Sequence, residues 1–131
     1  MDPGERRVGV ALSDPTRLLS SPLKIITVRS RAQAVAEVAA LVAPHAVAEI
    51  VVGHPRNTSG EIGPQARRAE ALAHELGRLV DVPVRLWDER YSTIEATALV
   101  GSRRGGRRGD RQRLDDVAAA VMLQTYLDAH R

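Results

Sequence analysis

The segment that most constrains the fold is a short β-branched run, Ile50-Val51-Val52, which ends at Gly53. A continuous apolar run of this length is typical of a parallel strand that is buried on both faces. A polar, glycine-containing loop follows, and Pro64 is well placed as the first residue of a helix that extends to about Val80. Pro83–Trp87 has the composition of the next strand. This part of the chain therefore predicts a sheet with parallel strands.

Two earlier segments predict an antiparallel pair of strands. Arg7–Ser13 alternates in hydrophobicity, and Leu23–Val28 is a second apolar segment. Asp14-Pro15 lies between them and is a turn signal. Within the first strand, the residues expected on one face are Val8, Val10 and Leu12.

The remaining segments predict helices and one loop. A first helix is expected from the capping box at Ser30 and Gln33 to about Ala43, and a short one from Ser92. The helix that starts at Pro64 should bury Ala69, Leu72, Leu76 and Leu79. The last helix, Asp115–His130, has Val117, Val121, Gln124 and Leu127 near one stripe. Gly101–Gly109 predicts a mobile loop. The order β-β-α-β-α-β-α-loop-α indicates an α/β fold, a mixed sheet flanked by helices, in a single domain spanning residues 1–131.

Composition excludes several classes of protein. The chain has 131 residues and no cysteine, so disulfides and thiolate metal sites are impossible. No apolar stretch approaches the roughly 20 residues that cross a bilayer. We expect a cytoplasmic protein that does not contact a membrane. A nucleophilic serine elbow and a Walker-type phosphate loop are also absent from the sequence.

Acidic residues occur at three positions where strands or helices begin or end. Asp2 precedes the first strand, Asp88-Glu89 follows the strand that ends at Trp87, and Asp115-Asp116 opens the predicted last helix. Carboxylates that converge on folding repel one another unless a cation lies between them, and a hard divalent ion with oxygen ligands resolves that repulsion. The pattern therefore favours a metal-dependent phosphodiesterase.

Each acidic cluster also has a simpler explanation. Asp2-Pro3-Gly4 is compatible with a turn, and Asp88-Glu89-Arg90 with a surface ion-pair cluster. Carboxylates in the first turn of a helix, as predicted for Asp115 and Asp116, are stabilised by the helix dipole. The four histidines show no metal-ligand spacing and are interpreted as structural or surface residues: His45, His54, His74 and His130.

Positive charge is concentrated between Arg103 and Arg113, a segment that contains six arginines and one aspartate. Guanidinium groups make bidentate contacts with phosphates, and glycines between them allow the segment to follow a phosphate path. We expect Arg103, Arg104, Arg107 and Arg108 to contact nucleic acid, although a solvated charge run is the alternative. Asn57, in the loop after Gly53, is either a turn residue or a substrate contact.

Four motifs in order resemble the YqgF/RuvX family. They are Asp2-Pro3-Gly4 with Arg7-Val8-Gly9-Val10-Ala11 and Ser13-Asp14-Pro15, Gly53-x-Pro55-x-Asn57-x-x-Gly60, Trp87-Asp88-Glu89-Arg90-x-Ser92-Thr93, and Asp115-x-x-Ala118-Ala119 with Gln124-x-Tyr126-Leu127. The resemblance covers essentially the whole chain. It implies an RNase H-like fold similar to that of the Holliday-junction resolvase RuvC, and a nuclease that processes the 5′ end of pre-16S ribosomal RNA.

The resemblance also implies a site. By motif, Asp2, Glu89 and Asp115 would be the catalytic acids and the ligands of Mg²⁺ or Mn²⁺; Glu89 is preferred to Asp88, and Asp115 to Asp116. The partner would be structured RNA, with branched DNA as the alternative, and the protein a monomer or a homodimer. The alternatives are a Holliday-junction resolvase, a non-catalytic nucleic-acid-binding module, and a small phosphate-handling or ATPase-like protein. In the family, several apolar residues precede the first acid, whereas only Met1 does here, which predicts a truncated first strand.

Overall fold

The computed structural model describes residues 1–3, 6–55, 63–88 and 111–130, and for residues 2, 3 and 111–116 it defines the backbone without the side chains. Its elements are β1 (Asp2–Pro3), β2 (Arg7–Ser13), β3 (Ser20–Thr27), α1 (Arg31–Ala39), β4 (Ile50–His54), α2 (Pro64–Leu79), β5 (Val84–Asp88) and α4 (Arg111–Ala129). Within these residues, no helix is both long and apolar enough to span a bilayer.

The strands form an antiparallel group and a parallel group. β1, β2 and β3 are antiparallel neighbours, and β4 pairs with β5 in parallel. Met1 joins the two groups, because its amino group donates to the Val51 carbonyl at 2.6 Å and its own carbonyl accepts from the Gly53 amide at 2.9 Å. The strands therefore follow one another in the order β3-β2-β1-β4-β5. The predicted mixed sheet is confirmed.

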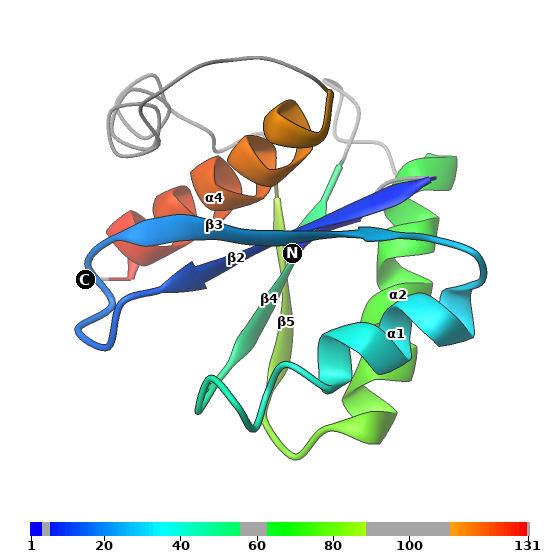
Figure 1. Ribbon diagram of the computed structural model, residues 1–131, viewed down its shortest axis with the longest axis horizontal. Helices are drawn as coiled ribbons and strands as arrows, with labels where there is room; N and C mark the ends of the chain where they lie inside the picture. Colours follow the sequence, from blue (N-terminus) through cyan, green and yellow to red (C-terminus); the bar gives the residue numbers. More distant parts are fainter. Residues whose placement is uncertain (4–5, 56–62, 89–110, 131) are drawn as a thin grey trace.

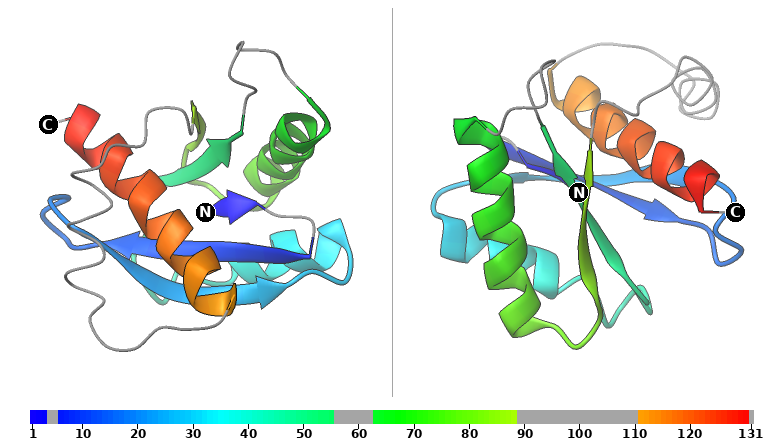
Figure 2. Two further views of the ribbon diagram at one scale, coloured as in Figure 1. Left: turned by 90° about the horizontal axis from the view of Figure 1, so that it is seen from above. Right: turned by 180° about the vertical axis from the view of Figure 1, so that it is seen from behind.

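Helices cover both faces of this arrangement (Figures 1 and 2). α1 and α2 pack together on one face, and α4 crosses β2 and β3 on the other. The larger core lies beneath α1 and α2 and contains Met1, Val8, Val10, Ile26, Val35, Val38, Ile50, Val52, Ala69, Leu72 and Leu76. A smaller cluster, in which Val51 packs with Met122 and Tyr126, lies beneath α4. β4 is thus buried on both faces, as its apolar sequence predicted.

α1 begins at the predicted capping box but ends early. The Ser30 hydroxyl accepts from the Gln33 amide at 3.1 Å, and the Gln33 side chain accepts from the Ser30 amide at 3.4 Å. The helix ends at Ala39 rather than near Ala43. The amides of Leu41 and Val42 bond to carbonyls three residues back, which tightens the chain into a turn before Pro44.

α2 starts at Pro64 as predicted, and Ala69, Leu72 and Leu76 are buried. The prediction for Leu79 is wrong, because this side chain is 60% exposed. Leu79 is the last helical residue, and the extended residue Val80 follows it. The apolar stripe of α2 therefore stops contacting the sheet one turn before the helix ends.

A buried polar contact joins α4 to the start of β3, which begins at Ser20 rather than at Leu23. The Gln124 side chain accepts from the Ser20 amide at 3.0 Å and donates to the Leu18 carbonyl at 2.9 Å. The Ser20 hydroxyl donates to the Ala120 carbonyl at 2.6 Å. Ser20 and Gln124 are both fully buried, so these bonds satisfy polar groups that water does not reach.

Candidate active site

The carboxyl ends of β4 and β5 form one edge of the sheet. The two strands are parallel, and their last residues, His54 and Asp88, are register partners. Because Met1 bonds to the backbone on both sides of Val52, Asp2 lies at the level of Gly53, beside this same edge. Open α/β sheets commonly bind ligands at the carboxyl ends of their strands. The edge thus brings Asp2 and the end of β5 together.

The last residues of β5 divide between the two faces of the sheet. The Trp87 indole N–H donates to the Thr125 hydroxyl at 3.0 Å, so this side chain contacts α4. The next position, Asp88, is paired in register with His54, whose ring contacts Glu70 of α2 at 2.8 Å. Side chains of a strand alternate between faces. Asp88 therefore belongs to the α2 face.

The start of α4 corrects one prediction. The helix begins at Arg111, not at Asp115, so Asp115 is its fifth residue and the first turn contains no acidic residue. The effect of the helix dipole is confined to the first and last turns. Stabilisation of the helix start therefore no longer explains Asp115 and Asp116.

Several predicted functional residues lie outside the residues that the structure describes. These are Asn57, Glu89, Ser92, Thr93, Arg103, Arg104, Arg107 and Arg108, together with the glycine-rich loop. Asp2 and Asp115 are placed by their backbone: Asp2 lies in β1 and Asp115 in α4, and these two elements pack against each other.

The histidine at the edge is buried against a partner that the sequence did not indicate. His54 is 2% exposed, and its Nε2 contacts a Glu70 carboxylate oxygen at 2.8 Å. The Glu70 side chain is 40% exposed, so water shares in solvating the carboxylate. The pair fastens α2 to the end of β4. Sixteen residues separate the two side chains, and no local pattern in the sequence indicates their contact.

Asp14, in the Ser13-Asp14-Pro15 motif, organises the turn between β2 and β3. Its carboxylate accepts from the amides of Leu18 at 2.8 Å and Leu19 at 3.0 Å, and from the Thr16 hydroxyl. These bonds, the one from the Leu19 amide first, lower the pKa of Asp14. Asp14 therefore stabilises a turn, at the end of β2 opposite to the candidate active site.

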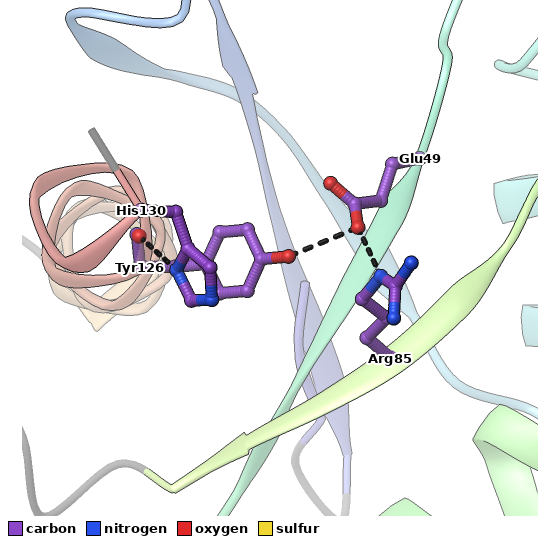
Figure 3. Close-up of polar contacts among 4 residues, drawn as sticks. All are labelled: Glu49, Arg85, Tyr126 and His130. Atoms are coloured by element: carbon purple, nitrogen blue, oxygen red, sulfur yellow. Dashed lines mark hydrogen bonds and ion pairs between the residues drawn. The ribbon is translucent and has the colours of Figure 1, made fainter.

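A second polar cluster lies beneath the carboxyl end of α4 and was not predicted (Figure 3). A Glu49 carboxylate oxygen accepts from the Tyr126 hydroxyl at 2.9 Å and from the Arg85 side chain. Burial, followed by the bond to Glu49, raises the pKa of Tyr126. His130 stacks on Tyr126 with ring centroids 4.1 Å apart, and its Nδ1 donates to the Tyr126 carbonyl at 2.8 Å.

The donor chemistry of the predicted site fits a divalent cation. Among the side chains that the structure describes, no three histidines or carboxylates come together as a metal site. The predicted ligands Asp2, Glu89 and Asp115 are not among those side chains. All three offer carboxylate oxygens, the ligands that Mg²⁺ and Mn²⁺ prefer, and two of them lie on elements in contact.

Comparison with known proteins assigns the chain to a family. Residues 1–129 match the family described as "RuvX: Holliday junction resolvase". The chain belongs to the RuvX family. A relative from Roseiflexus sp. (strain RS-1) is 41% identical over 131 residues, which are 100% of this chain and 93% of the relative. A relative from Pelotomaculum thermopropionicum is 42% identical over 98% of this chain and 84% of its own length. Both carry the name "Putative pre-16S rRNA nuclease".

The fold of this RuvX-family chain is also similar to that of a solved structure. The chain resembles RuvC in "T. thermophilus RuvC in complex with Holliday junction substrate", with a TM-score of 0.58 over 98% of this chain and 91% of the other. Sequence identity is 14%, so this match concerns the fold alone. The predicted RNase H-like, RuvC-like α/β fold and the predicted family are confirmed.

Proposed function

We propose that this protein is a metal-dependent nuclease that hydrolyses phosphodiester bonds, with Asp2, Glu89 and Asp115 as its catalytic carboxylates. The observation that carries the proposal is the arrangement of three elements around one edge. β1 lies beside β4, β5 ends immediately before Glu89, and α4 packs on β1 and β4. Membership of a family described as a junction resolvase, and relatives named as nucleases, give the same reaction class.

Strand alternation supports the choice of ligands. Met1 belongs to the core beneath α1 and α2, so the next position, Asp2, belongs to the α4 face. Trp87 contacts α4, whereas Asp88 belongs to the opposite face, which favours Glu89 over Asp88 as the proposed ligand after β5. Asp115 shares a helix stripe with Met122, which packs against β4 and β5. We therefore expect the three carboxylates to meet on the α4 side of the edge.

The chemistry of such a site divides between the chain and its ions. Bound Mg²⁺ or Mn²⁺ would neutralise the three carboxylates and supply electrostatic stabilisation and an activated water for an in-line displacement at phosphorus. The chain's own carboxylates would hold that charge at one edge of the sheet. The His54–Glu70 pair would keep the end of β4, and hence the position beside Asp2, in place.

The substrate we propose is pre-16S ribosomal RNA, which the name of the relatives contains, and within it the 5′ end. A four-way DNA junction is the second candidate, favoured by the description of the family. Arg103, Arg104, Arg107, Arg108 and Asn57 would contact the phosphates in either case. We further propose a single-domain, cytoplasmic protein, either monomer or homodimer.

The test is cleavage of both substrates by the protein and its Asp2→Asn and Glu89→Gln variants, with Mg²⁺, Mn²⁺, Ca²⁺ or EDTA. We expect Mg²⁺- or Mn²⁺-dependent cleavage that both variants lose while their melting temperatures stay unchanged. The preferred substrate is the one cut with the higher kcat/KM. Equal cleavage by the protein and both variants would refute the site, and binding without cleavage in any metal would favour a non-catalytic module.

A further inference from the structure

An open pocket of about 910 Å³ lies between the carboxyl end of α4, β5 and the turn after β2. The residues that line it include three with aromatic side chains, Trp87, Tyr126 and His130, and two arginines, Arg17 and Arg85. Trp87 is the next-to-last residue of β5, so the pocket begins beside the candidate active site. Measured along α4 at 1.5 Å per residue, His130 lies roughly 20 Å from Asp115.

The aromatic rings form a fixed platform. Tyr126 and His130 are stacked, with centroids 4.1 Å apart and planes 26° apart. Trp87 meets both edge-on, at 5.3 Å from Tyr126 and 5.4 Å from His130. The indole N–H bonds to Thr125, and the His130 Nδ1 bonds to the Tyr126 carbonyl, so neither ring is free to rotate. Tyr126 is 7% exposed, whereas His130 is exposed at the mouth of the pocket.

Two arginines give the pocket a positive wall. Arg85 bonds to Glu49 through its Nε, and its side chain is 57% exposed. Arg17 is exposed in the turn after β2 and has a left-handed backbone, φ 61°, which residues other than glycine rarely adopt. Among the described residues that line the pocket, Glu49 is the single acidic one, and its carboxylate is already engaged by Tyr126 and Arg85. These described residues therefore include two arginines and one acid.

We propose that this pocket binds one nucleotide of a single-stranded segment, with the base stacked on the His130 and Trp87 rings and the phosphate held by Arg17 and Arg85. Stacking on aromatic side chains accepts any base, because every base has a π-face. Guanidinium groups bind phosphate oxygens in pairs of parallel hydrogen bonds. A purely apolar ligand would leave both arginines unused, and an inorganic anion would leave the platform unused.

Binding of a nucleotide in this pocket does not depend on the proposed function. Only the statement that the nucleotide belongs to a nucleic-acid substrate rests on it. The pocket extends from Trp87, near the end of β5, to His130, which lies roughly 20 Å along α4 from Asp115, a distance that spans several nucleotides. The pocket would thus hold a single-stranded flank of the substrate rather than the phosphodiester that is cut. It would favour substrates with an unpaired end over fully paired ones.

Trp87 is the only tryptophan of the chain, so its fluorescence reports directly on the pocket. The experiment titrates the full chain, in EDTA to prevent cleavage, with adenosine 5′-monophosphate and with a six-residue oligoadenylate. We expect saturable quenching by both ligands, tighter for the oligonucleotide. Arg17→Ala and His130→Ala should each weaken binding about fivefold or more, the scale of a lost stacking or charge contact.

Matched controls remove the same groups elsewhere. Arg78→Ala and His74→Ala change exposed residues of α2 and should bind like the parent protein. Quenching that is absent, or unchanged in both pocket variants, would overturn the proposal. Equal affinity for ribose 5-phosphate would reduce the pocket to an anion site and overturn it too, as would equal affinity for adenosine without phosphate. Asp2→Asn should quench like the parent protein. Quenching by a parent protein that cleaves neither substrate in any metal would count against the nuclease and not against the pocket.

Discussion

The two halves of α4 differ in how they are joined to the rest of the molecule. The carboxyl-terminal half is tied to the sheet by side-chain bonds: Gln124 to Ser20 and Leu18, and Tyr126 to Glu49. The amino-terminal half carries Asp115 to the candidate active site. One helix thus has two regions with different roles under the proposed function. The second half fixes the position of the helix, and the first half would use that position for chemistry.

The largest predicted effect is a loss of nuclease activity on substitution in the amino-terminal half of α4. Asp115→Asn should lower cleavage roughly a hundredfold or more, because a metal ligand supplies several kcal/mol of transition-state stabilisation. The melting temperature should stay within error. Asp116→Asn is the matched control and should keep most of the activity. Single-turnover cleavage assays with both variants measure the difference, and equal losses would break the assignment of Asp115.

Substitutions in the carboxyl-terminal half of α4 should instead lower the free energy of unfolding. Gln124→Ala should lower the free energy of unfolding by about 2–4 kcal/mol, because it leaves the Ser20 amide and the Leu18 carbonyl without their partner in a buried site. Gln65→Ala, at an exposed position in the first turn of α2, should cost within about 0.5 kcal/mol. Urea denaturation measures both. A Gln124→Ala protein as stable as the parent would contradict the anchoring role.

A smaller loss of stability is expected on the α2 face of the sheet edge, where Glu70 contacts His54. Glu70→Ala removes the partner of buried His54 and should cost about 1–2 kcal/mol. Glu75→Ala breaks an exposed pair with Arg31 and should cost about 0.5 kcal/mol or less. Thermal unfolding of both variants tests this. If Glu70→Ala abolished cleavage at unchanged stability, the edge's α2 face would be catalytic, and our division of its two faces would be wrong.

The smallest effect concerns pH. Because burial raises the pKa of Tyr126 above its ordinary value near 10, the folded state holds this proton more tightly than the unfolded state. The resulting stability is fully present below the unfolded pKa, and it is lost as pH rises through the folded pKa. Urea unfolding between pH 8 and 11 should therefore show a decline that is shallower in Tyr126→Phe. An identical slope in both proteins would show that Tyr126 does not contribute.

Local patterns in the sequence predicted the elements well. Arg7–Ser13 is the first long strand as expected, the Ser30–Gln33 capping box is present, and α2 starts at Pro64. These features depend on alternation, capping and proline geometry within a few residues. Errors occurred where an element end depends on distant contacts. β3 begins at Ser20, where Gln124 bonds to it, and no pattern near Ser20 indicates that bond.

The candidate site was predictable in part, for the same physical reason. Acidic residues at element ends indicated which residues to consider, and the family motifs selected among them. The placement of Asp2 at the level of Gly53 required the backbone bonds of Met1 to β4. The cluster of Glu49, Arg85 and Tyr126 joins three segments far apart in the chain, and periodicity within any one of them carries no information about the others.

The central claim is that Asp2, Glu89 and Asp115 meet on the α4 side of the sheet edge and hold divalent ions. The most direct test is a crystal of the protein soaked in Mn²⁺, with anomalous diffraction locating the metal. We predict a peak within about 2.0–2.6 Å of carboxylate oxygens from all three residues, the range of hard divalent ions. Peaks located elsewhere, with these three carboxylates apart and unligated at a saturating Mn²⁺ concentration, would contradict the account.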